Sequence, residues 1–377
     1  MQQFSSICLD SRLPARSPYP ILTMPRATKQ SNPSPLGELA LLERIRLRAA
    51  QAPTPELRLG IGDDCALLRL APEEELAVTT DLSIAGRHFR LDWHPAESVG
   101  HRALARGLSD LAAMGARPVA AFLSLALPKD LVQKPKARSA ARGTWVDRFL
   151  DGFLSLAQAY KVPLAGGDLA ESTLAVADVV LTGAVRQGEA LLRSGARPGD
   201  LIYVTGNLGG AAVGYATLAQ LAAALKRDRS RSRLKAPANI PPKSLAVLSP
   251  HLYPKPRVAQ GLWLARNAMA TAAIDLSDGL STDLAHLCAE SGVAAELDAA
   301  SVPVAPGANS AHVLHGGEDY ELLFTAPPAA RVPPSIEGVS VTCIGRTTAT
   351  KRTSSPITLI TPKGAISLAP QGWQHFS

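Results

Sequence analysis

The sequence has few cysteines, and their spacing does not let them act together. Its 377 residues contain four, Cys8, Cys65, Cys288 and Cys343, with no CxxC pair and no Cys/His spacing typical of zinc. The pattern argues against a disulfide framework or a zinc site, and it favours free thiols in a reducing cytoplasm. Long apolar runs are also missing. None reaches the length of a transmembrane helix, and the first 23 residues lack the apolar core of a secretory signal, so we expect a cytoplasmic protein with no membrane partner.

Common catalytic signatures are absent as well. The chain has no GxxxxGK[ST] motif, so any use of ATP would proceed without the Walker lysine. No Ser-His-Asp or Cys-His nucleophile arrangement stands out. The run GNLGG at 206–210 lacks the full spacing of a dinucleotide-binding turn and the acidic residue that should follow it. Dinucleotide binding is therefore not favoured.

The net charge of +7 is concentrated in two segments. Residues 1–35 carry a net +3 and residues 226–247 a net +6, which leaves the rest of the chain slightly acidic at −2. A basic tail and a basic insertion differ from a basic binding face, so the sequence argues against a nucleic-acid partner. We expect residues 1–35 to form a disordered tail and residues 226–242 to form a flexible basic insertion.

Hydrophobic periodicity predicts mixed helices and strands in two halves of similar size. Helices are expected over 36–50, 94–116, 144–160, 211–225, 258–267 and 281–291. Strands are expected over 76–80, 119–127, 174–186, 201–205, 294–297, 320–325, 339–344 and 357–360. The strand over 76–80 should be buried and end at Asp81. We predict an α+β (mixed α/β) fold with two domains, residues 36–186 and residues 187–377.

The chain does contain six short motifs rich in glycine and carboxylates. They are GIGDD at 60–64, TTD at 79–81, LSD at 108–110, GGD at 166–168, DLSDG at 275–279 and GGED at 316–319. Each places Asp or Glu beside Gly, Ser or Thr at what reads as the end of a strand or the start of a helix. Carboxylates gathered without a local cation repel one another, so hard divalent cations with phosphate oxygens best explain the set. The motifs predict an Mg²⁺-dependent enzyme that acts on a nucleotide.

Each motif taken alone has a structural explanation. A single Asp is more often a helix N-cap or an Asx-turn residue, at roughly two to one. Asp110 is equally well explained as a solvated helix side chain, Arg193 as a surface arginine, and His88 as a structural histidine. The acidic positions together are harder to explain in this way. We expect five aspartates to converge in one cleft: Asp64, Asp81, Asp110, Asp168 and Asp278.

In this order, the motifs resemble those of the thiamine-monophosphate kinase family, within the wider group of aminoimidazole-ribonucleotide synthetase-like ATP-using enzymes. The resemblance is carried by GIGDDCAL, TTD followed by GRHF, LSDLAAMGA, GGD, RSGARPGDLIYVTG, AIDLSDGL and HGGEDYELLFT. It implies transfer of the ATP γ-phosphoryl group to thiamine monophosphate, which yields thiamine diphosphate, with Mg²⁺ as cofactor and ATP as co-substrate. It also implies a homodimer whose N-terminal sheets pair into a barrel-like centre, with α+β C-terminal domains outside.

The resemblance also implies roles for individual residues. The implied metal-binding set is Asp64, Thr79, Thr80, Asp81, Asp110, Asp168, Asp275 and Asp278. The implied catalytic residues are Asp64, Asp110, Asp168 and Asp278, and the implied ATP contacts are Gly167, Asp168, Arg193 and Ser277. The implied thiamine contacts are His88, Glu318 and Trp373, and a cationic thiazolium gives a physical reason for an aromatic wall and an acidic neighbour. The chain departs from the family pattern at Gly107, where Asn is usual, and at Leu169-Ala170, where Thr-Thr is usual.

The mechanism that this suggests is direct in-line transfer. The acceptor phosphate oxygen is already anionic at neutral pH, so no strong general base is needed, and catalysis would come from positioning and charge neutralisation. Two alternatives stay open. One is an aminoimidazole-ribonucleotide synthetase-like ligase, which matches the motifs less well. The other is a non-catalytic nucleotide or metal sensor that kept the fold.

Overall fold

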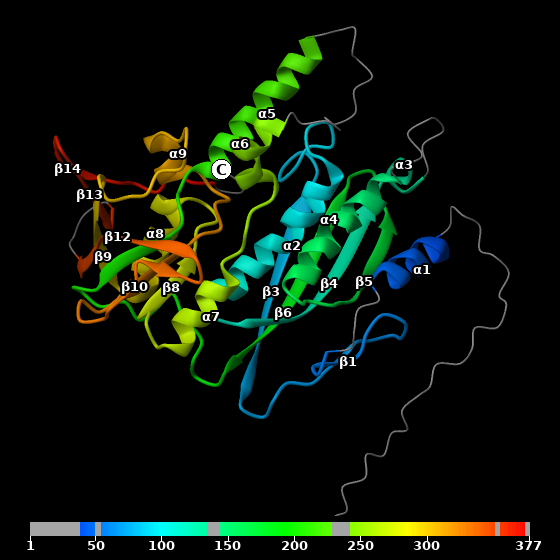
Figure 1. Cartoon of the computed structure of the whole chain (residues 1–377), viewed down its shortest axis with the longest axis horizontal. Coiled ribbons are helices and arrows are strands. Elements are labelled where there is room, and N and C mark those ends of the chain that lie inside the picture. Colours follow the sequence, from blue (N-terminus) through cyan, green and yellow to red (C-terminus); the bar gives the residue numbers. More distant parts are fainter. Residues whose placement is uncertain (1–37, 50–53, 134–142, 228–241, 351–354, 374–377) are drawn as a thin grey trace, which may run out of the picture.

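The computed structural model describes residues 38–49, 54–133, 143–227, 242–350 and 355–373 (Figure 1). The expected tail, residues 1–35, lies outside these ranges. The basic insertion lies outside them too, except at its ends. Lys226 and Arg227 belong to helix α5 (Gly210–Arg227), and Pro242 begins helix α6 (Pro242–Leu252).

The N-terminal half contains a four-stranded sheet whose two edge strands carry two of the predicted aspartates, Asp81 and Asp168. The strands are β3 (Glu74–Ile84), β6 (Val176–Arg186), β4 (Arg117–Leu127) and β5 (Leu164–Glu171), side by side in that order. β6 pairs antiparallel with β3 and β4, whereas β4 and β5 are parallel. The strands β1 (Leu57–Leu59) and β2 (Leu67–Leu68) form a separate small antiparallel pair that flanks the GIGDD motif.

Two helices cover one face of this sheet, and the other face is covered only in part. Residues of the β1–β2 segment pack over Ala120 and Ala184 there, and β3 is left exposed. The helices are α2 (Ala96–Ala113) and α4 (Trp145–Ala159), and α4 begins with a capping box between Thr144 and Asp147. On the opposite face, Leu76, Val78 and Leu82 of β3 are 53%, 57% and 47% exposed. A half-exposed apolar row on a strand departs from the usual alternation of a sheet whose outer face meets water.

The C-terminal half is built on a larger sheet with the path β14-β13-β9-β12-β7-β10-β8. Its strands are β7 (Leu201–Thr205), β8 (Ala272–Asp275), β9 (Val293–Asp298), β10 (Leu322–Ala326), β12 (Val339–Ala349), β13 (Ile357–Thr361) and β14 (Gly364–Ser367), with β11 (Ser335–Ile336) paired to β12. Its helices besides α5 and α6 are α7 (Val258–Arg266), α8 (Leu280–Ser291) and α9 (Ser310–His315). Two shorter N-terminal helices are α1 (Glu38–Ala49) and α3 (Lys129–Val132).

Helix α2 joins the two halves. It packs on β3 and β6 of the first sheet and on α7 and β8 of the second half, and Figure 1 shows it between the two. The contact with α7 is close, because a Cβ at Gly261 would lie 1.9 Å from the carbonyl oxygen of Ala112. One hydrophobic core extends across this junction and includes Leu108, Phe149, Leu264 and Phe324. A rigid helix therefore connects residues from both halves of the chain.

The structure confirms a mixed α/β fold and most of the expected elements, and the strand over 201–205 matches β7 at both ends. The expectation for 76–80 was wrong. The strand β3 continues to Ile84, so Asp81 lies inside it, and its alternate side chains are exposed rather than buried. Asp168 likewise lies inside β5, and Asp110 lies within the C-terminal part of α2, so neither occupies an element boundary. Two adjacent glycines hid β5, because glycine weakens a strand pattern.

The crossing of α2 and α4 depends on two glycines that face each other's backbone, and this gives a stability prediction. A Cβ at Gly152 would lie 1.8 Å from the carbonyl oxygen of Glu97, and one at Gly100 would lie 1.9 Å from that of Phe149. Backbone atoms cannot rotate away, so Gly152→Ala should lower the free energy of unfolding by about 3 kcal/mol. Ser155→Ala, on the exposed side of the same helix, should stay within about 0.5 kcal/mol of the parent. Denaturant unfolding of both variants measures this, and equal stabilities would contradict the close packing.

Candidate active site

Three carboxylates, one buried and two partly buried, meet where β3, α2 and β8 come together. They are Asp81, Asp110 and Asp275, called here the β3-side cluster. Asp110 accepts a hydrogen bond from the Thr79 hydroxyl, and Asp275, 3% exposed, accepts one of 2.7 Å from the Ser109 hydroxyl. Burial and the neighbouring Asp110 raise the pKa of Asp275 to about 7. Burial likewise raises the pKa of Asp81 to about 6, with Asp110 and Asp178 adding to the effect. These carboxylates destabilise one another's charged forms, as the motifs predict.

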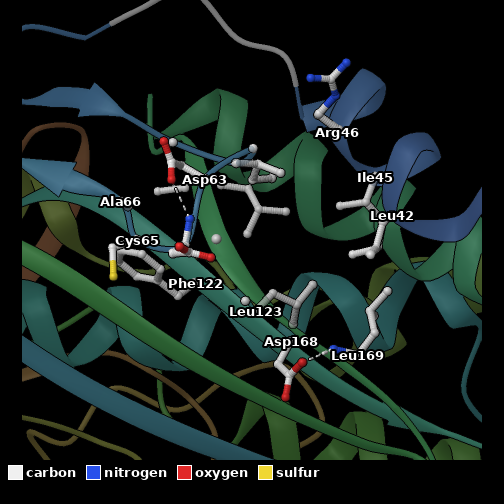
Figure 2. Close-up of a pocket in the computed structure, with 18 of the residues that line it drawn as sticks. Leu42, Ile45, Arg46, Asp63, Cys65, Ala66, Phe122, Leu123, Asp168 and Leu169 are labelled. Atoms are coloured by element: carbon white, nitrogen blue, oxygen red, sulfur yellow. Dashed lines mark hydrogen bonds between the residues drawn. The ribbon is translucent and has the colours of Figure 1, made fainter. Parts of the chain in front are cut away.

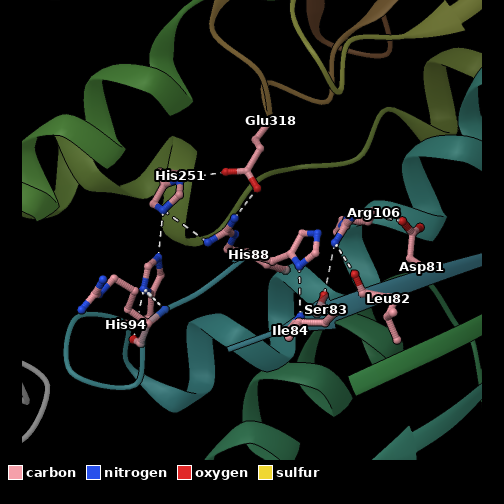
Figure 3. A network of polar contacts seen from close by, with 11 residues as sticks. Asp81, Leu82, Ser83, Ile84, His88, His94, Arg106, His251 and Glu318 are labelled. Carbon is pink, nitrogen blue, oxygen red and sulfur yellow. Dashed lines mark hydrogen bonds and ion pairs between the residues drawn. The ribbon is translucent and has the colours of Figure 1, made fainter. Parts of the chain in front are cut away.

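Two arginines supply positive charge to the cluster. Arg106 Nη2 lies 3.2 Å from Asp81 Oδ1, and its Nη1 donates to the carbonyl oxygen of Leu82 at 3.1 Å (Figure 3). Burial raises the pKa values of Asp110 and Asp275, and the charge of Arg193 opposes this rise without cancelling it. The compensation is incomplete, because Oδ2 of Asp81 is buried without a hydrogen-bond partner among the described residues.

The DLSDG loop at 275–279 lies against the GGED loop at 316–319. The backbone N–H of Glu318 donates to the carbonyl oxygen of Ser277 at 2.8 Å, and the Trp373 N–H donates to that of Asp278 at 3.3 Å. Asp283 accepts hydrogen bonds of 3.0 Å from the N–H groups of Asp278 and Gly279, and burial raises its pKa to about 8. The structure therefore brings Ser277, Asp278, Glu318 and Trp373 together.

A second set of predicted residues lines a pocket beside β5, called here the β5-side pocket (Figure 2). Its walls include Asp63 and Asp64 of the GIGDD motif, Gly167 and Asp168 of the GGD motif, and one face of α1. Gly167 is needed for backbone packing, because a Cβ there would lie 1.9 Å from the carbonyl oxygen of Leu123. At Leu169, where the family usually has Thr, the backbone N–H donates to Asp168 Oδ1 at 2.8 Å.

A single chain does not place all five predicted aspartates in one cleft. Asp81 lies on β3 and Asp168 on β5, the two opposite edges of the sheet, with β6 and β4 between them. Three strand spacings correspond to about 14 Å. Within the described residues, no three His, Cys, Asp or Glu side chains form a group that could hold a metal ion. The expected single cleft is thus not formed by one chain. Asp64 and Asp168 line the β5-side pocket, and Asp81 and Asp110 lie together in the β3-side cluster.

The residues of the β3-side cluster nevertheless suit a hard divalent cation. Their donors are carboxylate and hydroxyl oxygens, which Mg²⁺ prefers, and the unpartnered Asp81 Oδ2 is a free ligand position. Thr80 lies on the outer side of β3 instead, where its hydroxyl donates to Asp178 at 3.1 Å. His88, in the turn after β3, accepts the N–H of Ile84 at 3.0 Å through Nδ1 (Figure 3).

Sequence reasoning missed several charged residues that complete the site. Arg102, Arg106 and Asp110 follow one another at intervals of four, so they share one face of α2, and this spacing was a usable signal. His251 gave no such signal, because only the folded chain brings α6 to α2. At the Gly107 departure the space is tight, since a Cβ there would lie 3.3 Å from the Leu181 Cβ.

Comparisons with known proteins first define a class. The model of the AIR synthase related protein N-terminal domain matches residues 62–185, and that of the C-terminal domain matches residues 197–357. These two matches cover more than half of the chain and describe a protein built from both AIR synthase related domains. Separately, no helix in the described ranges has the length and apolar character needed to cross a membrane.

Individual relatives are more specific. The chain is 38% identical over 357 residues to a thiamine-monophosphate kinase of Escherichia coli K12, covering 90% of this chain and 98% of that protein. A crystal structure of thiamine-monophosphate kinase from Stenotrophomonas maltophilia K279a is 36% identical, with a TM-score of 0.68 and coverage of 86% and 96%. A structure of AaThiL complexed with AMPPCP and TMP is 30% identical, with a TM-score of 0.66 and coverage of 93% and 100%. The chain belongs to the thiamine-monophosphate kinase family, which confirms the resemblance read from the motifs.

The raised pKa values of the buried carboxyls predict how metal-free stability depends on pH. Asp81, Asp275 and Asp283 have pKa values of about 6, 7 and 8 in the folded chain, above their ordinary value of 3.8. These three carboxyls therefore bind more protons in the folded state than in the unfolded state between about pH 4 and pH 8, and the stability that they contribute falls as pH rises through this interval. The lowered pKa values of the buried His94 and His251 oppose this trend below about pH 6.5 without changing its sign above that pH. Thermal unfolding in EDTA should show a midpoint lower by several degrees at pH 8 than at pH 5.5.

Mg²⁺ should reverse this trend, because it competes with protons for the same oxygens. The rise in melting temperature on adding Mg²⁺ should be larger at pH 8 than at pH 5.5. Asp275→Asn, which removes one of the titrating groups, should flatten the slope in EDTA. A metal-free midpoint that stays level or rises over this interval would contradict the charge balance described here.

Proposed function

We propose that the chain transfers the γ-phosphoryl group of ATP to thiamine monophosphate, forming thiamine diphosphate and ADP. The observation that carries the proposal is the 38% identity to a thiamine-monophosphate kinase across 90% of the chain, and the acidic β3-side cluster is in keeping with it. The AaThiL complex with AMPPCP and TMP supports the choice of co-substrate and acceptor. We further propose that residues 36–186 and 187–377 are the two domains and that the protein works in the cytoplasm.

In this reaction an oxygen of the acceptor phosphate forms a bond to the γ-phosphorus, and the bond from that phosphorus to the β–γ bridging oxygen breaks. The acceptor oxygen needs no deprotonation, so the protein's task is to hold two polyanions in line. Asp81, Asp110 and Asp275 would hold Mg²⁺, with Asp64, Thr79, Thr80, Asp168 and Asp278 completing the proposed metal set. Bound Mg²⁺ would neutralise phosphate charge. Gly167, Arg193 and Ser277 would bind ATP, and His88, Glu318 and Trp373 the thiamine.

The protein is proposed to act as a homodimer, and the first sheet supports this. Its outer face, covered only in part by the β1–β2 segment, carries the half-exposed Leu76, Val78 and Leu82, and both β3 and β5 are edge strands without a partner among the described residues. Apolar rows and open edges of this kind are normally covered. A two-fold arrangement that sets β3 of one copy beside β5 of the other would cover the face and close the sheets into a barrel.

The same arrangement would reunite the divided aspartates. It would carry the β5-side pocket of one copy, with Asp64 and Asp168, to the β3-side cluster of the other, with Asp81, Asp110 and Asp275. We propose that each active site is shared in this way between two chains. The expectation of one cleft would then hold for the dimer, although it fails for the single chain.

An assay of ADP release with competing acceptors tests the reaction. Thiamine monophosphate should be phosphorylated. Free thiamine should not be, because it has no phosphate oxygen to act as acceptor, and the ribonucleotide precursors of aminoimidazole should not be, because they lack the cationic thiazolium ring proposed to contact Glu318 and Trp373. In the same assay, Asp168→Asn should lower turnover by roughly 10²–10⁴, since it removes a charge proposed to hold metal and triphosphate. Asp130→Asn, on the exposed helix α3, is the matched control and should retain parental turnover. Parental activity of Asp168→Asn at saturating Mg²⁺ and ATP would contradict its assignment.

Mixed dimers test the shared site. When an Asp64→Asn chain and an Asp81→Asn chain are co-expressed, each mixed dimer should have one doubly altered site and one intact site. Random mixing makes about half of the dimers mixed, so activity should return to about a quarter of the parental value. Asp81→Asn mixed with Asp275→Asn should recover nothing, because both changes lie in the same cluster. Failure of the first mixture to recover activity, with dimers present, would show that each chain has its own complete site.

A further inference from the structure

A buried polar network lies behind Glu318 and joins three segments distant in sequence (Figure 3). Its members are Arg102 on α2, His94 just before α2, and His251 on α6, which are 5%, 1% and 2% exposed. The Glu318 side chain is 32% exposed, so its carboxylate is backed by the network and open on its other side. Arg102 Nη2 forms an ion pair with Glu318 Oε1, and His251 Nδ1 lies 3.2 Å from Oε2.

The tautomers of His94 and His251 follow from their hydrogen-bond partners. His94 Nδ1 lies 3.1 Å from the backbone N–H of Arg90, which donates to it, and 3.3 Å from the carbonyl oxygen of the same residue. The shorter contact favours a neutral His94 that carries its proton on Nε2. Burial, followed by the charge of Arg102, lowers the pKa of His94 to about 3, which keeps the ring neutral. His94 Nε2 lies 3.0 Å from His251 Nε2 and therefore donates to it.

Arg102 fixes the same tautomer of His251 independently. Its Nη1 lies 3.3 Å from His251 Nε2, and a guanidinium can only donate. Two donors thus converge on His251 Nε2, which must be unprotonated. Burial and the charge of Arg102 also lower the pKa of His251, so its single proton sits on Nδ1, which lies 3.2 Å from Glu318 Oε2. The Nδ1 contact is close but not well aligned, because this atom has no hydrogen-bond partner of good geometry among the described residues. Glu318 is therefore paired with the charged Arg102 and faces the N–H of the neutral His251.

The backbone around Glu318 is strained, which argues for a functional role. Glu318 and Tyr320 have φ values of 68° and 51°, a region that residues other than glycine rarely occupy. Burial alone would raise the pKa of Glu318, but Arg102 and His251 lower it below the ordinary range. Burying this many polar groups costs more than a packed apolar contact would, so stability alone does not explain the network.

We propose that Arg102, His251 and His94 are positioning residues that present Glu318 to the substrate as a fixed, ionised acceptor. This rests on the proposed function and deepens it. An ionised carboxylate with its inner side already paired selects a ligand that brings a positive charge or an N–H group to its open side. The cationic, amino-substituted ring system of thiamine monophosphate has this chemistry, whereas the triphosphate of ATP does not. The network should therefore determine the affinity for the acceptor and not that for ATP.

A pair of substitutions at His251 separates positioning from packing. Asn can place an N–H where His251 has Nδ1, and Gln can place one where it has Nε2. His251→Asn should keep the donor to Glu318 and leave the KM for thiamine monophosphate within about threefold of the parent, whereas His251→Gln should raise it about tenfold. The KM for ATP should stay unchanged in both variants. Calorimetric titration with thiamine monophosphate should show the same difference in Kd.

A second comparison covers the case in which His251→Gln does not fold. Arg102→Gln and Glu318→Gln should each weaken binding of thiamine monophosphate, but the double variant should be no weaker than Glu318→Gln alone, because Arg102 acts through Glu318. Equal KM values for the two His251 variants, a parallel rise in the KM for ATP, or additive effects of Arg102 and Glu318 would each overturn the proposal. A parent protein that binds thiamine monophosphate without phosphorylating it would overturn the proposed reaction and leave the positioning role standing.

Discussion

The repulsion among buried carboxylates is the constraint on which the site depends. Asp81, Asp110 and Asp275 approach one another from three elements, and Arg106 and Arg193 compensate their charge only in part. A fold would not gather these groups for stability, because each raises the free energy of its neighbours' charged forms. The arrangement becomes favourable once a cation and a polyanion occupy the site, so the same charges that weaken the empty protein prepare it to bind its substrates.

The second constraint is that the N-terminal sheet is incomplete within one chain. Its partly covered face and two open edges leave β3 exposed and β3 and β5 unpaired among the described residues, and two of the predicted ligands, Asp81 and Asp168, lie on these edges. A second copy placed against this sheet would therefore both cover the exposed part of β3 and bring Asp168 close to Asp81. If two copies close the barrel, assembly and formation of the catalytic site are linked, and a separated chain would lack half of its ligands.

The sequence predicted the elements better than the geometry of the site. Long periodic segments such as α2 and α4 were found because their apolar faces repeat over several turns. Asp81 and Asp168 were placed at strand ends, because Thr and Gly beside an acid suggest a turn, whereas the sheet extends β3 and β5 through both residues. The backing of Glu318 could not be foreseen, since His251 lies 149 residues from Arg102 and only the packing of α6 on α2 brings them together.

Helix α2 explains how one scaffold serves both substrates. Arg102, Arg106 and Asp110 lie at successive intervals of four, so they share one face of the helix. Arg102 pairs with Glu318, Arg106 pairs with Asp81, and Asp110 is a proposed metal ligand. The helix is fixed on both sides by close contacts, with α4 at Gly100 and with α7 at Gly261, which leave no space even for a methyl group. Its residues therefore cannot shift independently. A displacement that disturbed Arg102 and the proposed acceptor contact Glu318 would also disturb Asp110, a proposed metal ligand. In-line transfer needs the two substrates held at a fixed separation, and placing both sets of contacts on one rigid helix provides it.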